Sequence, residues 1–252
     1  METNVDMDQG LQVFGETDIG KKRENNEDYF LINHEKKLFL LADGMGGQNA
    51  GEVASYFSCI YFDQLFSVKA PDIKTHLLEV FKETNSRIIK KSKSEKELDG
   101  MATTFIACHI NGGLAHLCHA GDVRAYHFKD NELRQVTDDH STVMMMVRRG
   151  LITEQQAHIH PLRNMVYKSI GAGKMVKPDY NLIQYSSNDL LMLCSDGLWN
   201  ILSNNEIKKV LQKETTVREK TRMLIDESNK AGGEDNITVI LIEFSNHKIS
   251  GG

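Results

Sequence analysis

The chain has 252 residues, of which 40% are hydrophobic and 26% charged, and its formal net charge is −5. This ordinary globular composition excludes collagen-like, mucin-like and disordered chains. The negative balance argues against sequence-independent nucleic-acid binding, and no apolar run approaches the roughly 20 residues of a membrane span.

The first third of the chain predicts strands followed by two helices. Residues 11–18 alternate apolar and polar side chains, the period of a half-buried strand. Two short apolar runs, 29–33 and 37–42, are joined by three polar residues and indicate a hairpin. Amphipathic helices are expected from about Val53 and again after Asp72.

The rest of the chain is predicted to be rich in hairpins, followed by helices and a last strand. Turn residues separate strands in two predicted hairpins, 103–110 with 114–118 and 123–128 with 132–136. The remaining expected elements are short helices at 141–149 and 153–157, a strand at 190–194, helices at 206–212 and 217–230, and a strand at 237–244. Because hairpins outnumber β-α-β crossovers, the predicted fold class is α+β with largely antiparallel sheets.

The cysteines and the N-terminus bear on the cellular compartment. Cys59, Cys108, Cys118 and Cys194 are far apart or lie inside apolar runs, without a CxxC pair. They are expected to be reduced core residues and not a disulfide framework or a zinc site. Residues 1–10 are acidic and polar, unlike a secretory signal or a transit peptide. We therefore expect a cytoplasmic protein.

Acidic residues recur where apolar runs end or begin. They are Asp43, Asp122, Asp196, Asp235 and the pair Glu27-Asp28. A single Asp-Gly pair is usually only a turn, but Asp-Gly follows both of the most apolar runs. Carboxylates gathered at a sheet rim repel one another and need protons or cations. Hard oxygen ligands without a Cys or His set favour Mg²⁺ or Mn²⁺.

Arg23 precedes the Glu27-Asp28 pair by a few residues. A guanidinium next to a metal-carboxylate centre suits a tetrahedral oxyanion, since its planar fork can hold two phosphate oxygens. Taken alone, Arg23 would be read as a surface arginine paired with Glu24.

Several segments together resemble a known family. In chain order they are Arg23-x-x-x-Glu27-Asp28, Leu41-Ala42-Asp43-Gly44-Met45-Gly46-Gly47, Thr103-Thr104, His119-Ala120-Gly121-Asp122-Val123-Arg124, Thr137-Asp138-Asp139-His140-Ser141, Cys194-Ser195-Asp196-Gly197-Leu198-Trp199 and Gly233-Glu234-Asp235-Asn236-Ile237-Thr238. The set is similar to the PP2C (PPM) family of metal-dependent protein Ser/Thr phosphatases in its compact bacterial form, from about Gly15 to Phe244. The family's fold is a β-sandwich of two antiparallel sheets flanked by pairs of helices.

The resemblance implies a role for each acidic residue. Asp43 would bridge two Mn²⁺ or Mg²⁺ ions, one of them also bound by the Gly44 carbonyl, and Asp196 and Asp235 would complete the set. Glu27 and Asp28 would act at or just outside the ligand shell, partly through water, and Asp122 with Asp196 would hold a weaker third ion. Arg23 would bind the substrate phosphate. The reaction implied is direct attack on a phosphoserine or phosphothreonine by a water or hydroxide that bridges the two ions.

Two residues depart from the family pattern. Met45 stands where animal members often carry a histidine proposed as general acid, and Val123 stands where serine is usual. Methionine cannot give a proton, so a metal-bound water or another group must protonate the leaving oxygen. His140 and His160 are candidates, and we expect the water. Val123 is not a ligand, so little effect on metal binding is expected.

We expect one domain over residues 10–246, with flexible tails at 1–9 and 247–252. Residues 141–173 correspond to the insertion called the flap in bacterial members. The flap contains the Met144-Met145-Met146 run, more often a core stripe than a substrate surface, and the pair His158 and His160, to which we assign no metal.

The sequence also bears on two other function classes, a nucleotide-binding oxidoreductase and a phosphoprotein-binding module. Gly44-x-Gly46-x-x-Asn49 imitates a dinucleotide-binding fingerprint, but the third glycine is missing. A catalytically weak phosphoprotein-binding or kinase-regulating module should have lost a metal carboxylate, yet Asp43, Asp196 and Asp235 are all present. The expected partners are phosphorylated proteins and a cognate Ser/Thr kinase, with no nucleic acid and no membrane, and the chain is expected to be a monomer.

Overall fold

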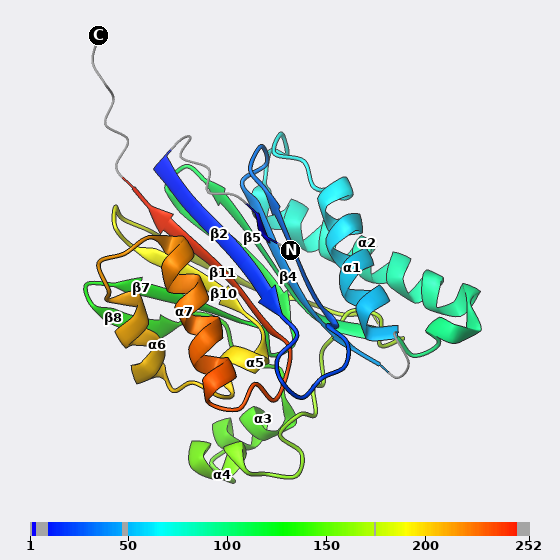
Figure 1. Ribbon diagram of the computed structural model, residues 1–252. Coiled ribbons are helices and arrows are strands. Elements are labelled where there is room, and N and C mark those ends of the chain that lie inside the picture. Colours follow the sequence, from blue (N-terminus) through cyan, green and yellow to red (C-terminus); the bar gives the residue numbers. More distant parts are fainter. Residues whose placement is uncertain (1, 4–9, 47–49, 174, 246–252) are drawn as a thin grey trace.

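The structure is a computed structural model that describes residues 2–3, 10–46, 50–173 and 175–245. Two antiparallel sheets form its centre (Figure 1). The six-stranded sheet has the order β1-β2-β11-β10-β7-β8, and the five-stranded sheet has the order β3-β4-β5-β6-β9. The strands are β1 (Glu2–Thr3), β2 (Leu11–Asp18), β3 (Asp28–Asn33), β4 (Leu38–Met45), β5 (Ala102–Asn111), β6 (Leu114–Ala120), β7 (Arg124–Lys129), β8 (Glu132–Gln135), β9 (Asp179–Gln184), β10 (Leu190–Cys194) and β11 (Ile237–Phe244).

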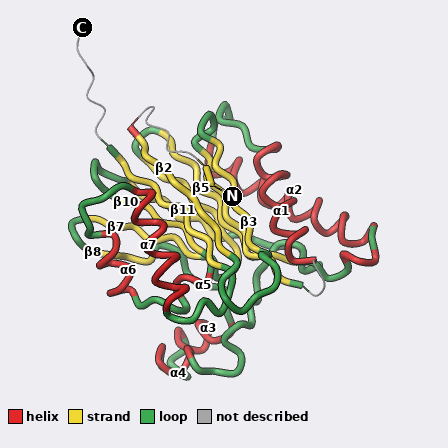
Figure 2. Tube along the Cα trace, viewed as in Figure 1, coloured by secondary structure: helices red, strands yellow, loops and turns green. Residues whose placement is uncertain are grey.

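Helices cover the outer faces of both sheets, so that the strands lie between them (Figure 2). The α-helices are α1 (Ala50–Leu65), α2 (Ile73–Ser94), α3 (Thr142–Arg148), α4 (Glu154–His158), α5 (Asp196–Trp199), α6 (Asn204–Leu211) and α7 (Val217–Lys230), and a 3₁₀ turn, η2, spans Lys96–Leu98. Capping boxes begin both α6, at Ser203, and α7, at Thr216. Helices α3 and α4 lie apart from the sandwich at one end of the strands (Figure 1).

The strand residues alternate between two different buried layers. Along β4, Phe39 and Leu41 pack between the sheets, while Leu38 and Leu40 pack under α1 and α2. Along β11, Ile240 faces the layer between the sheets and its neighbours face the cluster under α6 and α7. Because both faces of these strands are buried, they read as continuous apolar runs in the sequence.

The predicted fold class is confirmed, and two strands were not predicted. All the predicted hairpins form, with ends that differ by up to three residues from those expected. One unpredicted strand is the two-residue β1, which lies within the expected tail and pairs with β2. The other is β9, at the edge of its sheet, where Ile183 is the buried residue. An edge strand with so little buried surface lacks the apolar pattern that predicts a strand. The predicted tails, 1–9 and 247–252, lie outside the described residues apart from Glu2 and Thr3.

The four cysteines are free and buried, as expected. Among the described residues, no helix combines the length and the apolar character needed to cross a membrane.

Candidate active site

A cavity of about 220 Å³ opens where the two sheets meet α5 and the flap. It brings together all the predicted site residues except Asp28, although they come from both sheets and from loops far apart in the sequence. The lining residues are Arg23, Glu27, Asp43, Gly44, Met45, Gly46, Thr104, Asp122, Asn164, Val166, Asp196, Asp235 and Asn236.

The strand β4 delivers Asp43 and Gly44 to the cavity. The Thr103 hydroxyl donates to the Asp43 carbonyl at 2.7 Å, and the Gly44 amide donates to the Glu27 carbonyl at 3.1 Å. A Cβ atom on Gly44 would lie 2.3 Å from the Gly51 carbonyl oxygen and 2.6 Å from that of Glu27. Only glycine therefore fits at this position without moving the backbone of helix α1 or of the Glu27 loop.

Two carboxylates come from the other sheet. Asp196 is the first residue of α5, directly after β10, and Asp235 lies in the loop before β11. The Arg23 guanidinium donates to Asp235 Oδ2 at 2.6 Å, and it lies in the loop between β2 and β3. The guanidinium and the carboxylate are both partly exposed to the cavity. Arg23 is therefore within reach of a phosphate in this cavity, and it is paired with Asp235 and not with Glu24.

Asp28 lies behind the cavity and joins the two sheets. It is only 6% exposed, and its Oδ2 accepts hydrogen bonds from the Ser195 hydroxyl at 2.7 Å and the Thr238 hydroxyl at 2.6 Å. Ser195 precedes Asp196, and Thr238 lies in β11 a few residues after Asp235. Asp28 therefore holds the segments that carry two other carboxylates.

Asp122 follows a glycine turn between β6 and β7. Gly121 has φ +113°, and a Cβ there would lie 2.3 Å from the Thr104 Cβ, so the turn requires glycine. The indole N–H of Trp199 donates to the Asp122 carbonyl at 3.0 Å, and the guanidinium of Arg124 lies 3.5 Å from the centre of that ring. Arg124 in turn forms a buried ion pair with Asp139 at 2.7 Å.

The carboxylates destabilise one another's charged form. Burial raises the pKa of Asp28 to about 7, and burial together with Asp139 raises that of Asp122 to about 6. The pKa values of Asp43 and Asp196 are raised well above the ordinary aspartate value by burial and by the neighbouring aspartates. Such a group is stable at neutral pH only with protons or cations.

The donor set fits a hard divalent cation. The cavity offers four aspartates, a glutamate and a backbone carbonyl, which are the oxygen ligands that Mg²⁺ and Mn²⁺ prefer. Within the described residues, no group of three or more His, Cys, Asp or Glu side chains is already arranged to hold a metal ion. One reason is visible at Asp235, whose carboxylate is turned to Arg23.

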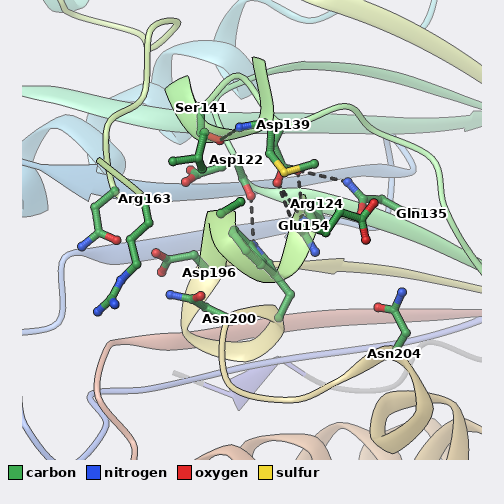
Figure 3. Close-up of a pocket in the computed structure, with 15 residues that line it drawn as sticks. Asp122, Arg124, Gln135, Asp139, Ser141, Glu154, Arg163, Asp196, Asn200 and Asn204 are labelled. Carbon is green, nitrogen blue, oxygen red and sulfur yellow. Dashed lines mark hydrogen bonds and ion pairs between the residues drawn. The ribbon is translucent and has the colours of Figure 1, made fainter. Parts of the chain in front are cut away.

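A second cavity of about 260 Å³ continues from the first under the flap. The two cavities share Asp122, Asn164 and Asp196. Figure 3 shows Arg163 at one end of the second cavity, with Gln135 and Asn204 toward the other. Its walls mix amide, charged and apolar side chains.

The structure also shows where the histidines and the cysteine considered for catalysis or metal binding lie relative to the first cavity. Neither His140 nor His160 lines the first cavity. His158 belongs to the flap helix α4, and its side chain lies outside the described residues. Burial raises the pKa of the Cys194 thiol well above its usual range, so this residue is no nucleophile.

Asn164 and Val166 were not predicted. They reach the first cavity from the flap, and no feature of the flap sequence singles them out. Thr104 and Asn236 also line it and lie in the quoted motifs, where no role was given to them.

Comparison with known proteins identifies the family of the chain. Residues 17–232 match the family Protein phosphatase 2C. The chain is 35% identical to a serine/threonine phosphatase stp of Listeria monocytogenes, over 90% of this chain and 93% of that protein. It is 34% identical to the protein phosphatase PhpP of Streptococcus pneumoniae, over 91% and 96%. The crystal structure of the serine/threonine phosphatase PstP/Ppp of Mycobacterium tuberculosis superposes with a TM-score of 0.88 at 34% identity, covering 94% of this chain and 99% of that one. The catalytic domain of PstP in complex with two manganese ions gives 0.85 at 33% identity, over 94% and 99%. The chain therefore belongs to the protein phosphatase 2C family, and it is a protein serine/threonine phosphatase.

Proposed function

We propose that the chain hydrolyses phosphoserine and phosphothreonine in proteins with the help of two Mn²⁺ or Mg²⁺ ions, and that a weaker third ion binds beside them. The observation that carries the proposal is the convergence of Asp43, Asp196 and Asp235 on one cavity that also contains Arg23. The manganese complex of the related PstP domain supports the choice of metal.

The lining of the cavity supports the proposed metal ligands. Asp43, the Gly44 carbonyl, Asp196 and Asp235 would hold the two ions, with Glu27 close by, and Asp122 with Asp196 would hold the third. Divalent cations supply activation of water for attack on phosphorus and screening of the phosphoryl charge. Asp28 would act indirectly. It accepts hydrogen bonds from the hydroxyls of Ser195 and Thr238, which lie close in sequence to the proposed ligands Asp196 and Asp235.

Arg23 has two alternative partners in this proposal. Its guanidinium now pairs with Asp235, and neutralisation of that carboxylate by a cation would release it. The freed fork can then bind two oxygens of the substrate phosphate. Arg23 thereby links occupation of the metal site to recognition of the phosphoester.

The polypeptide of the substrate would lie partly in the second cavity. This cavity begins at Asp122 and Asp196 and runs along the flap, which supplies Arg163 and Asn164 to its lining. His140 and His160 lie outside the first cavity, which supports metal-bound water as the proton donor to the leaving oxygen. Both cavities are built from one chain, so catalysis needs no second copy, and the substrates imply an opposing protein kinase.

The decisive experiment is hydrolysis of a phosphothreonine peptide with Mn²⁺, Mg²⁺ or EDTA. It is run on the natural chain, on Asp43→Asn and on Asp63→Asn, a matched change in α1 outside the cavity. We expect metal-dependent turnover in the natural chain and in Asp63→Asn. Asp43→Asn should lose turnover and bind both ions more weakly in calorimetry, because a shared ligand serves both.

Turnover that persists in EDTA would overturn the metal mechanism. Two ions bound to Asp43→Asn at the natural affinity would overturn the shared role of Asp43. Metal binding without any turnover would point instead to a phosphoprotein-binding module.

A further inference from the structure

His140 is buried at the base of the flap, next to the turn that carries Asp122. The side chain is 1% exposed, and its ring stacks on His119 with centroids 4.7 Å apart. The Gly121 amide donates to His140 Nδ1 at 3.1 Å, and the His140 amide donates to the Gly121 carbonyl at 3.0 Å. This pair of hydrogen bonds joins His140 directly to the residue before Asp122.

The hydrogen bond from the Gly121 amide fixes the tautomer of the ring. A backbone N–H can only donate, so Nδ1 must be unprotonated where it receives the Gly121 amide. The ring proton then lies on Nε2, which is 3.2 Å from Asp179 Oδ2. Burial lowers the pKa of His140 to about 4, in agreement with a neutral ring. Nδ1 of His140 thus accepts a hydrogen bond from the Gly121 amide, and Nε2 donates toward Asp179.

The far side of the ring is held by an ion pair. The Lys168 ammonium donates to Asp179 Oδ1 at 2.5 Å and lies 3.1 Å from His140 Nε2. Asp179 begins β9, and Lys168 lies on the returning end of the flap. The Tyr167 amide also donates to the His140 carbonyl at 2.9 Å. One buried ring therefore ties both ends of the flap and an edge strand to the Gly121 turn.

We propose that His140 is a positioning residue that sets the Asp122 carboxylate for catalysis through its Nδ1 hydrogen bond to Gly121. The Asp179–Lys168 pair holds the ring in the orientation that this bond requires. The effect on turnover rests on the role given to Asp122 in the proposed function. The hydrogen bond itself can be tested without that role.

Two substitutions separate the nitrogens of the ring. In His140→Asn the amide oxygen can take the place of Nδ1, while the reach to Asp179 is lost. In His140→Gln the longer amide can take the place of Nε2, while the acceptor for Gly121 is lost. Both remove the stacked ring, so their general destabilisation is matched. His127→Gln is the control, because His127 contacts Asp189 at the end of β10 away from Asp196.

The first readout is amide hydrogen exchange at Gly121 in the metal-free protein. We expect exchange to speed up about tenfold in His140→Gln, the effect of one buried hydrogen bond, and to stay near the natural rate in His140→Asn and His127→Gln. The second readout is turnover of a phosphothreonine peptide at saturating Mn²⁺. It should fall about tenfold in His140→Gln, mainly in kcat, and be largely retained in His140→Asn.

A double-mutant cycle tests whether His140 acts through Asp122. Adding His140→Gln to Asp122→Asn should cause no further loss of turnover if the two residues share one effect. Additive losses, equal turnover of the Asn and Gln variants, or unchanged exchange at Gly121 in His140→Gln would each overturn the proposal. Full turnover of Asp122→Asn alone would refute the catalytic role of Asp122, and the effect on turnover proposed for His140 falls with it.

Discussion

Neutralising Asp122 should stabilise the metal-free protein while removing most, but not all, of its activity. Burial and the nearby Asp139 raise the pKa of Asp122 from its ordinary value of 3.8 to about 6. Since one pKa unit corresponds to about 1.4 kcal/mol, the ionised carboxylate costs about 3 kcal/mol of folding free energy. Asp122→Asn keeps the size and hydrogen-bonding character of the turn and removes that cost.

The gain must depend on pH. Below the unfolded pKa, both states carry the proton on Asp122, and the variant has no electrostatic advantage. As the pH rises from the unfolded pKa of 3.8 to the folded pKa of about 6, the natural protein loses stability, and above about 6 the full difference of about 3 kcal/mol remains. At pH 5 the advantage should be about half as large.

Denaturant unfolding in EDTA at pH 5 and pH 8 measures the stability advantage of Asp122→Asn at each pH. Asp226→Asn is the control, because Asp226 is an exposed aspartate of α7. Excess Mn²⁺ should reduce or reverse the advantage of Asp122→Asn, since the natural chain gains binding free energy that the variant lacks. A variant that is no more stable than the natural protein at pH 8 would refute the electrostatic reasoning.

Two further substitutions test the same site. Arg23→Ala should raise KM for a phosphothreonine peptide more than it lowers kcat, with partial rescue by Arg23→Lys, which cannot form the two-pronged contact; unchanged steady-state constants would leave Arg23 an ordinary surface residue. Gly44→Ala should lower the melting temperature by several degrees and abolish turnover, because its Cβ would lie 2.3 Å from the Gly51 carbonyl oxygen; calorimetric unfolding at the natural temperature would contradict this steric argument.

The sequence predicted the sheets well because their signals are local. Alternation in β2 and the turn residues at Gly112 and Gly113 each act within a few positions. Strand β9 was missed because its pairing with β6 is decided by distant residues and buries little of its own surface.

The candidate site also combines features with local sequence signals and features that depend on distant residues. The aspartates could be named because they end or precede apolar runs and match a family pattern. Their exact partners could not, because Arg23 meets Asp235 across 212 positions of the chain. Asn164 reaches the cavity only through the path of the flap, and no local pattern in the sequence encodes that path.

The hydrogen bonds of Asp28 make catalysis a property of how the two sheets dock. Asp28 begins β3 in one sheet, while Ser195 and Thr238 belong to segments of the other. Each sheet could keep its own ladder of backbone hydrogen bonds while the two sheets shifted relative to each other. The metal ligands proposed above would then move apart, because they come from both sheets. Turnover should therefore report a change in the packing of the two sheets more sensitively than circular dichroism, which reports the strands themselves. We expect pressure, or a bulky side chain placed between the sheets, to abolish turnover before any strand loses its backbone hydrogen bonds.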